Sequence, residues 1–92
     1  MKANNSYPLY PVDSHKSFYG KCYVELAEED GAVVTYLVSY ATRVLKRLSD
    51  GTIIRLWDGW SATTQRHVNS FLYHIGRPEL CGKSNWYKIP TE

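Results

Sequence analysis

The stretch from residue 32 to residue 57, AVVTYLVSYATRVLKRLSDGTIIRLW, decides the fold class of this chain. Its first part, residues 32–40, is almost entirely β-branched and aromatic, which is typical of a strand buried on much of both faces. The remainder predicts two more strands, about residues 42–48 and 52–57, around Asp50-Gly51, a dipeptide that strongly favours a hairpin turn. Short turns between consecutive strands predict an antiparallel meander.

The register of the predicted hairpin depends on its turn. A two-residue turn at Asp50-Gly51 places Lys46 opposite Arg55 and Val44 opposite Trp57. Like charges directly opposite each other destabilise a sheet, so this pair beside a tryptophan favours a surface that holds an acidic partner or a phosphate backbone. The other interpretation is that these long side chains extend into water and reach nearby carboxylates.

The residues before this stretch predict one further strand and an arm. Residues 17–27 alternate between two faces, which is the pattern of a half-buried strand. Cys22 falls on the same face as Val24, which predicts a buried thiol that packs as a small hydrophobic residue. Residues 1–15 have no periodicity, and we expect them to form an N-terminal arm.

A helix is predicted after the hairpin. Ser61 is a good N-cap for an apolar stripe at helical spacing, and the predicted helix spans about residues 62–75. Gly76 is typical of the position just after a helix end. Residues 84–90 then predict a last edge strand that ends at a proline.

Together these elements predict an α+β fold in the order β-β-β-β-α-β. We expect an antiparallel β-meander of four to five strands packed by one α-helix, because the apolar stripe of the helix must cover one face of the sheet. The length predicts a single domain over residues 1–92, made of the arm (1–15) and an α+β core (16–92).

The composition narrows the class of protein. The net charge of +2 is far from the strongly basic stripe of a dedicated DNA-binding protein. Two cysteines are too few for a disulfide framework, and no apolar run approaches the roughly 18 residues that span a bilayer. The first residues have no apolar signal-peptide core, so we expect a cytoplasmic protein that does not contact a membrane.

No catalytic site can be assigned from the sequence. Asp58, Ser61 and His67 offer the residue types of a hydrolytic triad, but no nucleophile elbow is present and Ser61 is better placed to cap the helix. Phosphate-binding glycine motifs are missing as well. We therefore predict no enzymatic activity, and we expect His67 to be a partly buried histidine bonded to a backbone carbonyl or a tyrosine.

A metal site is not predicted either, and no cofactor is expected. His67 and His74 are seven residues apart, so about 10.5 Å separates them along a helix axis. A structural zinc site assembled by folding remains open as an alternative. Its candidate ligands are Cys22, Cys81, His15, His67 and His74.

Three motifs carry a resemblance to a known family. They are SFYGK (residues 17–21), SYATRV (39–44) and SATTQRHVNSFL (61–72), of which the last is the most specific. The chain resembles a family of small proteins of unassigned function from bacteriophages and mobile elements of Gram-positive bacteria. The resemblance implies a phage accessory protein that works in the host cytoplasm, and it transfers no catalytic residue. Cys22, Trp57 and Trp60 depart from the family pattern.

Small phage accessory proteins without an active site act by binding. Our leading hypothesis is a counter-defence inhibitor of the anti-CRISPR type, which binds a bacterial defence effector such as a CRISPR nuclease complex. The first alternative is a nucleic-acid-binding accessory protein that stacks aromatic rings on bases, and the second is a small zinc-stabilised binding protein. The residues predicted to contact the partner are Lys46, Arg47, Arg55, Trp57 and Trp60.

Overall fold

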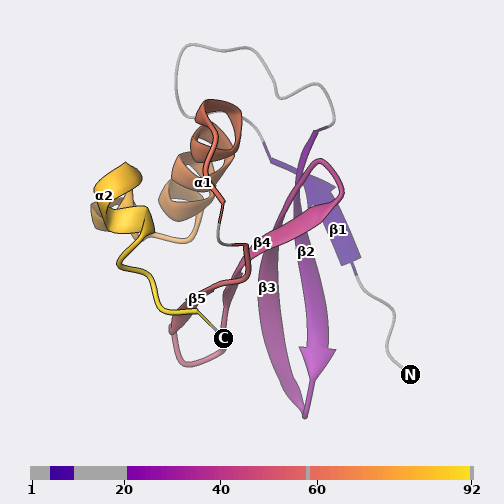
Figure 1. Ribbon diagram of the computed structural model, residues 1–92. Coiled ribbons are helices and arrows are strands. Elements are labelled where there is room, and N and C mark those ends of the chain that lie inside the picture. Colours follow the sequence, from indigo (N-terminus) through magenta and orange to yellow (C-terminus); the bar gives the residue numbers. More distant parts are fainter. Residues whose placement is uncertain (1–4, 10–20, 58, 92) are drawn as a thin grey trace.

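The computed structural model describes residues 5–9, 21–57 and 59–91. The strands come first in the chain and the helices follow (Figure 1). The strands are β1 (Asn5–Pro8), β2 (Cys22–Glu29), β3 (Ala32–Ser39), β4 (Thr42–Arg47) and β5 (Ile53–Arg55). The helices are α1 (Ala62–His74), the short 3₁₀ helix η1 (Pro78–Leu80) and α2 (Lys83–Trp86).

The sheet is a meander in which every strand pairs with the next along the chain, in the order β1-β2-β3-β4-β5. All of these pairs are antiparallel, and α1 lies across one face of the sheet (Figure 1). The predicted α+β class, and an antiparallel meander packed by one helix, are therefore confirmed. The fifth strand lies at the other end of the chain from its predicted position, because β1 belongs to the predicted arm and pairs with β2.

The predicted last strand, residues 84–90, is wrong. The segment forms α2 and two turns, and only Thr91 pairs with β5, as an isolated parallel bridge to Arg55. The physical reason is the burial of Trp86, whose side chain is packed in the core at the end of the short helix α2. A flat edge strand would turn alternate side chains of this segment away from the core.

Two Asp-Gly turns connect strands, and they differ in length. Asp30 and Gly31 both have positive φ and form the two-residue turn between β2 and β3, where Glu29 faces Ala32. Such a pair of positive φ angles is required by a type I′ turn. This turn therefore has the tight geometry that the sequence predicted for Asp50-Gly51.

The turn between β4 and β5 contains one residue more than predicted. Leu48 N–H donates to the carbonyl of Thr52, and only Gly51 within the loop has positive φ. The register therefore shifts by one residue, so that Lys46 faces Ile54 and Arg55 faces Leu45. The predicted pairing of Lys46 with Arg55 is wrong. A three-residue loop with a final left-handed glycine avoids this opposition of like charges.

The ends of α1 follow the predicted signals. Ser61 Oγ accepts a hydrogen bond from the Thr64 backbone N–H at 3.1 Å, so the N-cap is confirmed. At the other end, Gly76 has positive φ and Arg77 N–H donates to the Leu72 carbonyl at 2.7 Å. This Schellman arrangement satisfies the last carbonyls of the helix and turns the chain toward η1.

The main core lies between the sheet and the helices. Cys22 is fully buried there, which confirms its predicted role as a packed thiol. A bulge in β4 contributes Val44 and Leu45 side by side to this core, because Leu37 faces Leu45 while Val38 faces Arg43. The buried members of the core are Leu9, Cys22, Val24, Leu37, Val44, Leu45, Ile53, Val68, Phe71, Leu72, Trp86 and Ile89.

Candidate functional site

The C-terminal segment positions a group of aromatic side chains around Trp86. The indole N–H of Trp86 donates to the Gly59 carbonyl at 2.8 Å, and its ring lies 6.4 Å from that of Trp57. The Trp57 ring lies so close to the backbone at Gly59 that only glycine fits there, since a Cβ would lie 2.5 Å from the ring. The link between β5 and α1 is thus packed against α2.

Two exposed rings and two cations surround this buried centre. Lys83 Nζ lies 4.6 Å from the centre of the Trp60 ring. The Arg55 guanidinium lies 5.4 Å from the ring centres of both Trp86 and Tyr87. These distances allow cation–π attraction. We name this group the aromatic–cationic surface, and its members are Arg55, Trp57, Trp60, Lys83, Trp86 and Tyr87.

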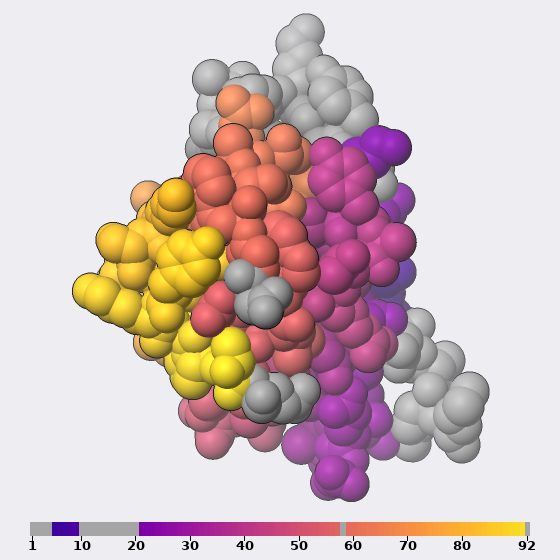
Figure 2. Space-filling model, viewed as in Figure 1, coloured from indigo at the N-terminus to yellow at the C-terminus, as the bar shows by residue number. Residues whose placement is uncertain are grey.

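Figure 2 shows this part of the molecule from outside. The segment near residue 60 (orange) and the C-terminal segment (yellow) lie side by side on the face in view. Trp60 is 37% exposed and Tyr87 is 50% exposed, whereas Trp86 beneath them is buried. The surface therefore offers ring faces and charges to the outside on a packed base.

A chain of hydrogen bonds fixes the exposed Trp60. Its indole N–H donates to Gln65 Oε1 at 2.7 Å, and Gln65 Nε2 donates to Asn69 Oδ1 at 2.8 Å. The same Asn69 oxygen accepts the backbone N–H of Gly82, at the start of α2, at 3.3 Å. The first turns of α1 thereby hold Trp60 and α2 in one arrangement, which lowers the ordering cost of any contact made there.

The structure brings together three of the five predicted contact residues. Arg55, Trp57 and Trp60 belong to the aromatic–cationic surface. Lys46 lies on the opposite face of the sheet, where it faces Ile54 and Tyr36. Arg47 faces Thr35 and Ile53 and is outside the surface.

Sequence reasoning missed the contribution of α2 to this site. The predicted edge strand contains Trp86 and Tyr87, which would point to opposite faces of a sheet, and it leaves Lys83 outside. The signal that was present is Gly82, whose positive φ starts the short helix. Gly82 stands just before Lys83 and four residues before Trp86, and a glycine at that position favours a bend in the chain.

His67 and Cys22, two of the side chains that the sequence offers to catalysis or metal binding, are in the core. His67 is fully buried, and its Nδ1 lies 2.7 Å from Ser39 Oγ, which is also 3.4 Å from Thr64 Oγ1. One partner of His67 is thus the side-chain hydroxyl of Ser39, which the prediction did not name. Burial lowers the pKa of His67 and raises the pKa of Cys22 to about 12. The neutral form of each is favoured, as expected of packed core groups.

The four described candidates for metal ligation do not converge. Cys22 pairs with Ser39 in the sheet, His67 Nδ1 bonds to Ser39 Oγ, Cys81 Sγ points to the Asn69 carbonyl, and His74 Nε2 bonds to Tyr7 at 2.6 Å. In the part of the chain that the structure describes, no group of three or more His, Cys, Asp or Glu side chains could hold a metal ion. His15 and Asp58 lie outside the described residues.

Comparison with protein families assigns the chain to one family. Residues 7–88 match a family of unknown function (DUF8033). The chain belongs to this family. The expected membership of a family without assigned function is confirmed, and the phage origin of the DUF8033 family stays a prediction. Comparisons with curated proteins and with solved structures found no match.

The match includes all segments that build the aromatic–cationic surface, from Arg55 to Tyr87. The residues of this surface therefore all lie within the part of the chain that matches the family. Among the described residues, no helix is both long enough and apolar enough to cross a membrane.

Proposed function

We propose that this protein acts by binding a partner protein through the aromatic–cationic surface. The observation that carries the proposal is the placement of exposed Trp60 and Tyr87 beside Lys83 and Arg55 on a rigid base. Tryptophan, tyrosine and arginine dominate the binding energy of protein interfaces because they combine large apolar area with a polar group. Neither Lys83 nor Arg55 forms an ion pair with a described residue, so no carboxylate of the described chain competes with a partner for these charges.

The chemistry of this surface favours a partner with carboxylates next to apolar side chains. A carboxylate that reaches Lys83 or Arg55 would be held by a charge-assisted hydrogen bond, and the ring faces would accept its apolar neighbours. The finer proposal is an inhibitor of a bacterial defence effector, such as a CRISPR nuclease complex, acting in the host cytoplasm. That part depends on the sequence resemblance and not on the geometry.

Nucleic acid is the second candidate partner. It is favoured by one observation, the exposed ring faces next to cations, because single-stranded nucleic acids are bound by ring stacking and positive charge. The net charge of +2 is modest for this role. Salt distinguishes the two, since binding to phosphates weakens steeply as the salt concentration rises.

A pull-down tests the proposal. The tagged protein is incubated with a lysate of a Gram-positive bacterium that carries a CRISPR system, with and without nuclease treatment, and captured proteins are identified by mass spectrometry. We expect a defence protein to be enriched in both samples by the native chain, and to be lost with the double variant Trp60→Ala and Lys83→Gln. Capture that disappears after nuclease treatment would favour nucleic acid instead.

A further inference from the structure

A cavity of about 280 Å³ lies beside the β4–β5 turn, and no member of the aromatic–cationic surface lines it. Three segments form its wall: the β4–β5 turn with the start of β5, the chain around η1, and the C-terminal segment from α2 onward. The lining residues are Gly51, Thr52, Ile53, Arg77, Leu80, Asn85, Lys88, Ile89 and Pro90. The volume suits a ligand of a few non-hydrogen atoms or a single side chain, near the lower end of ordinary ligand pockets.

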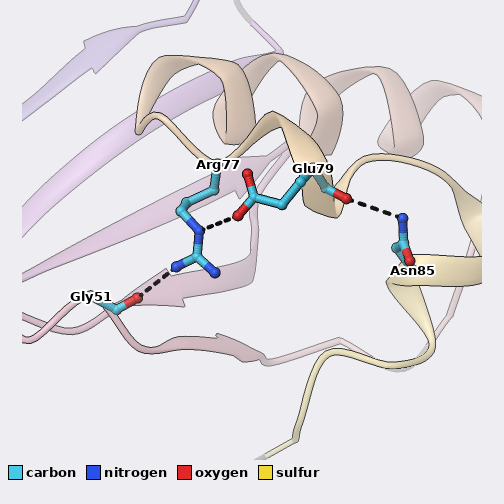
Figure 3. A network of polar contacts seen from close by, with 4 residues as sticks. All are labelled: Gly51, Arg77, Glu79 and Asn85. Atoms are coloured by element: carbon cyan, nitrogen blue, oxygen red, sulfur yellow. Dashed lines mark hydrogen bonds and ion pairs between the residues drawn. The ribbon is translucent and has the colours of Figure 1, made fainter.

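Arg77 is oriented by contacts on both sides, as Figure 3 shows. Its Nε donates to Glu79 Oε2 at 2.6 Å, and its Nη1 lies 3.3 Å from the Gly51 carbonyl. A guanidinium carries five N–H donors, so these bonds leave others for a ligand. The ion pair with Glu79 is exposed on both sides, and exposed pairs of this kind are weak enough to be exchanged.

Lys88 adds a second positive charge to the cavity wall. It forms no ion pair with any residue in the ranges 5–9, 21–57 and 59–91. Two carboxylates on neighbouring segments have other partners: Glu79 accepts from Arg77, and Asp50 accepts from the backbone N–H of Thr52 at 2.9 Å.

The rest of the wall is apolar. Ile53, Leu80 and Ile89 contribute aliphatic side chains, and Pro90 also lines the cavity. The Asn85 amide is turned to the carbonyls of Cys81 and Glu79, at 2.8 and 3.3 Å, so it supports the wall instead of presenting its donors to the cavity. A cavity lined by an arginine, a lysine and several aliphatic side chains fits a ligand with one anionic and one apolar end.

We propose that this cavity binds an organic carboxylate that carries a branched aliphatic group. The planar guanidinium of Arg77 matches the two oxygens of a carboxylate, Lys88 adds attraction, and the aliphatic end lies on the isoleucine and leucine side chains. The same chemistry is found in a free small acid and in a peptide that ends in leucine. This site shares no lining residue with the aromatic–cationic surface, and its proposal does not depend on the proposed partner.

Titration followed by amide and arginine side-chain NMR tests the proposal. The probes are 4-methylpentanoate and its amide, and the peptide Gly-Gly-Leu with a free or an amidated C-terminus. We expect saturable shifts at the cavity residues with the acids and none with the amides. A free acid that binds as well as the peptide identifies a small-molecule site, and tighter binding of the peptide identifies capture of a protein C-terminus.

Three variants make the outcome specific. Arg77→Gln and Lys88→Gln should each weaken binding at least fivefold, while Glu79→Gln should tighten it because the competing carboxylate is gone. The spectra report folding, so Lys88→Gln serves if Arg77→Gln unfolds the chain. Equal binding of acids and amides, the absence of saturation, or an affinity that ignores all three substitutions would overturn the proposal.

Discussion

The imidazole of His67 lies in the core, between α1 and β3, bonded to the Ser39 hydroxyl and 5.7 Å from the Tyr40 ring centre. Burial lowers the pKa of His67 below that of the unfolded chain. In the interval between these two pKa values, the unfolded state binds a proton that the folded state does not. Stability is thus fully present above the unfolded pKa near 6.5 and falls as the pH falls below it.

We predict that His67→Gln makes stability less dependent on pH below 6.5. The free energy of unfolding of the native chain should fall by up to about 1.4 kcal/mol per pH unit in this interval. The variant should be less stable at pH 7, but its free energy of unfolding should not show this slope. Urea unfolding at pH 7, 6 and 5 measures the difference. The exposed Thr63 on the same helix provides the control, since Thr63→Ala removes no titratable group and should keep the native slope. An unchanged slope in His67→Gln would contradict the prediction.

The two thiols should differ in reactivity. Burial raises the pKa of Cys22 to about 12, whereas Cys81 is only partly buried, with a pKa raised by burial and by Glu79. Since the thiolate is the reactive form, a thiol reagent at pH 8 should modify Cys81 in the folded protein and Cys22 only after unfolding. Mass spectrometry of native and urea-treated samples counts the modified sites. Rapid labelling of native Cys81→Ser would show that Cys22 is accessible.

At the scale of elements, the two Asp-Gly turns show what local sequence can predict. The dipeptide correctly indicates a turn at Asp30-Gly31 and at Asp50-Gly51, but it does not set the loop length. The observed three-residue loop goes with a β5 whose Ile53 is buried in the core, a tertiary contact that the dipeptide does not report. A shift of one residue changes the face of every side chain, which is why the predicted opposition of Lys46 and Arg55 failed.

Gly51 should be sensitive to substitution because of its backbone alone. Its φ is +94°, and a Cβ there would meet nothing within 4 Å, so Gly51→Ala should cost about 1–2 kcal/mol of unfolding free energy without any clash. Chemical denaturation measures this cost. Ser49→Ala, in the same turn but without positive φ, should change stability by less than about 0.5 kcal/mol. Equal effects of the two substitutions would refute the assigned turn.

Gly59 should be sensitive for a different reason. A Cβ at this position collides with the Trp57 ring, so Gly59→Ala should move Trp57 away from Trp86. The near-ultraviolet circular dichroism from the tryptophans should therefore change, while Gly51→Ala leaves it as in the native chain. A native spectrum for Gly59→Ala would show that the two rings do not pack as described.

At the scale of the whole molecule, the sequence predicted the layers better than the site. The alternation of β2, the aromatic run of β3 and the capped stripe of α1 each depend on local patterns, and local patterns are what a sequence displays. The candidate site depends on α2 folding back so that Trp86 reaches the Gly59 carbonyl, 27 residues earlier in the chain. A periodic sequence pattern does not indicate such a long-range contact. The sequence therefore predicted Arg55, Trp57 and Trp60 as contact residues but not their neighbours Lys83 and Tyr87.

The most direct test of the account is the affinity of the captured partner for single variants of the aromatic–cationic surface. Trp60→Ala should weaken binding by about 2 kcal/mol or more, roughly thirtyfold in Kd, as expected of an anchoring tryptophan. Tyr73→Ala is the matched control, because this tyrosine is also exposed but lies at the far end of α1. If Trp60→Ala binds like the native chain, or if Tyr73→Ala weakens binding as much, the surface is not where the partner binds.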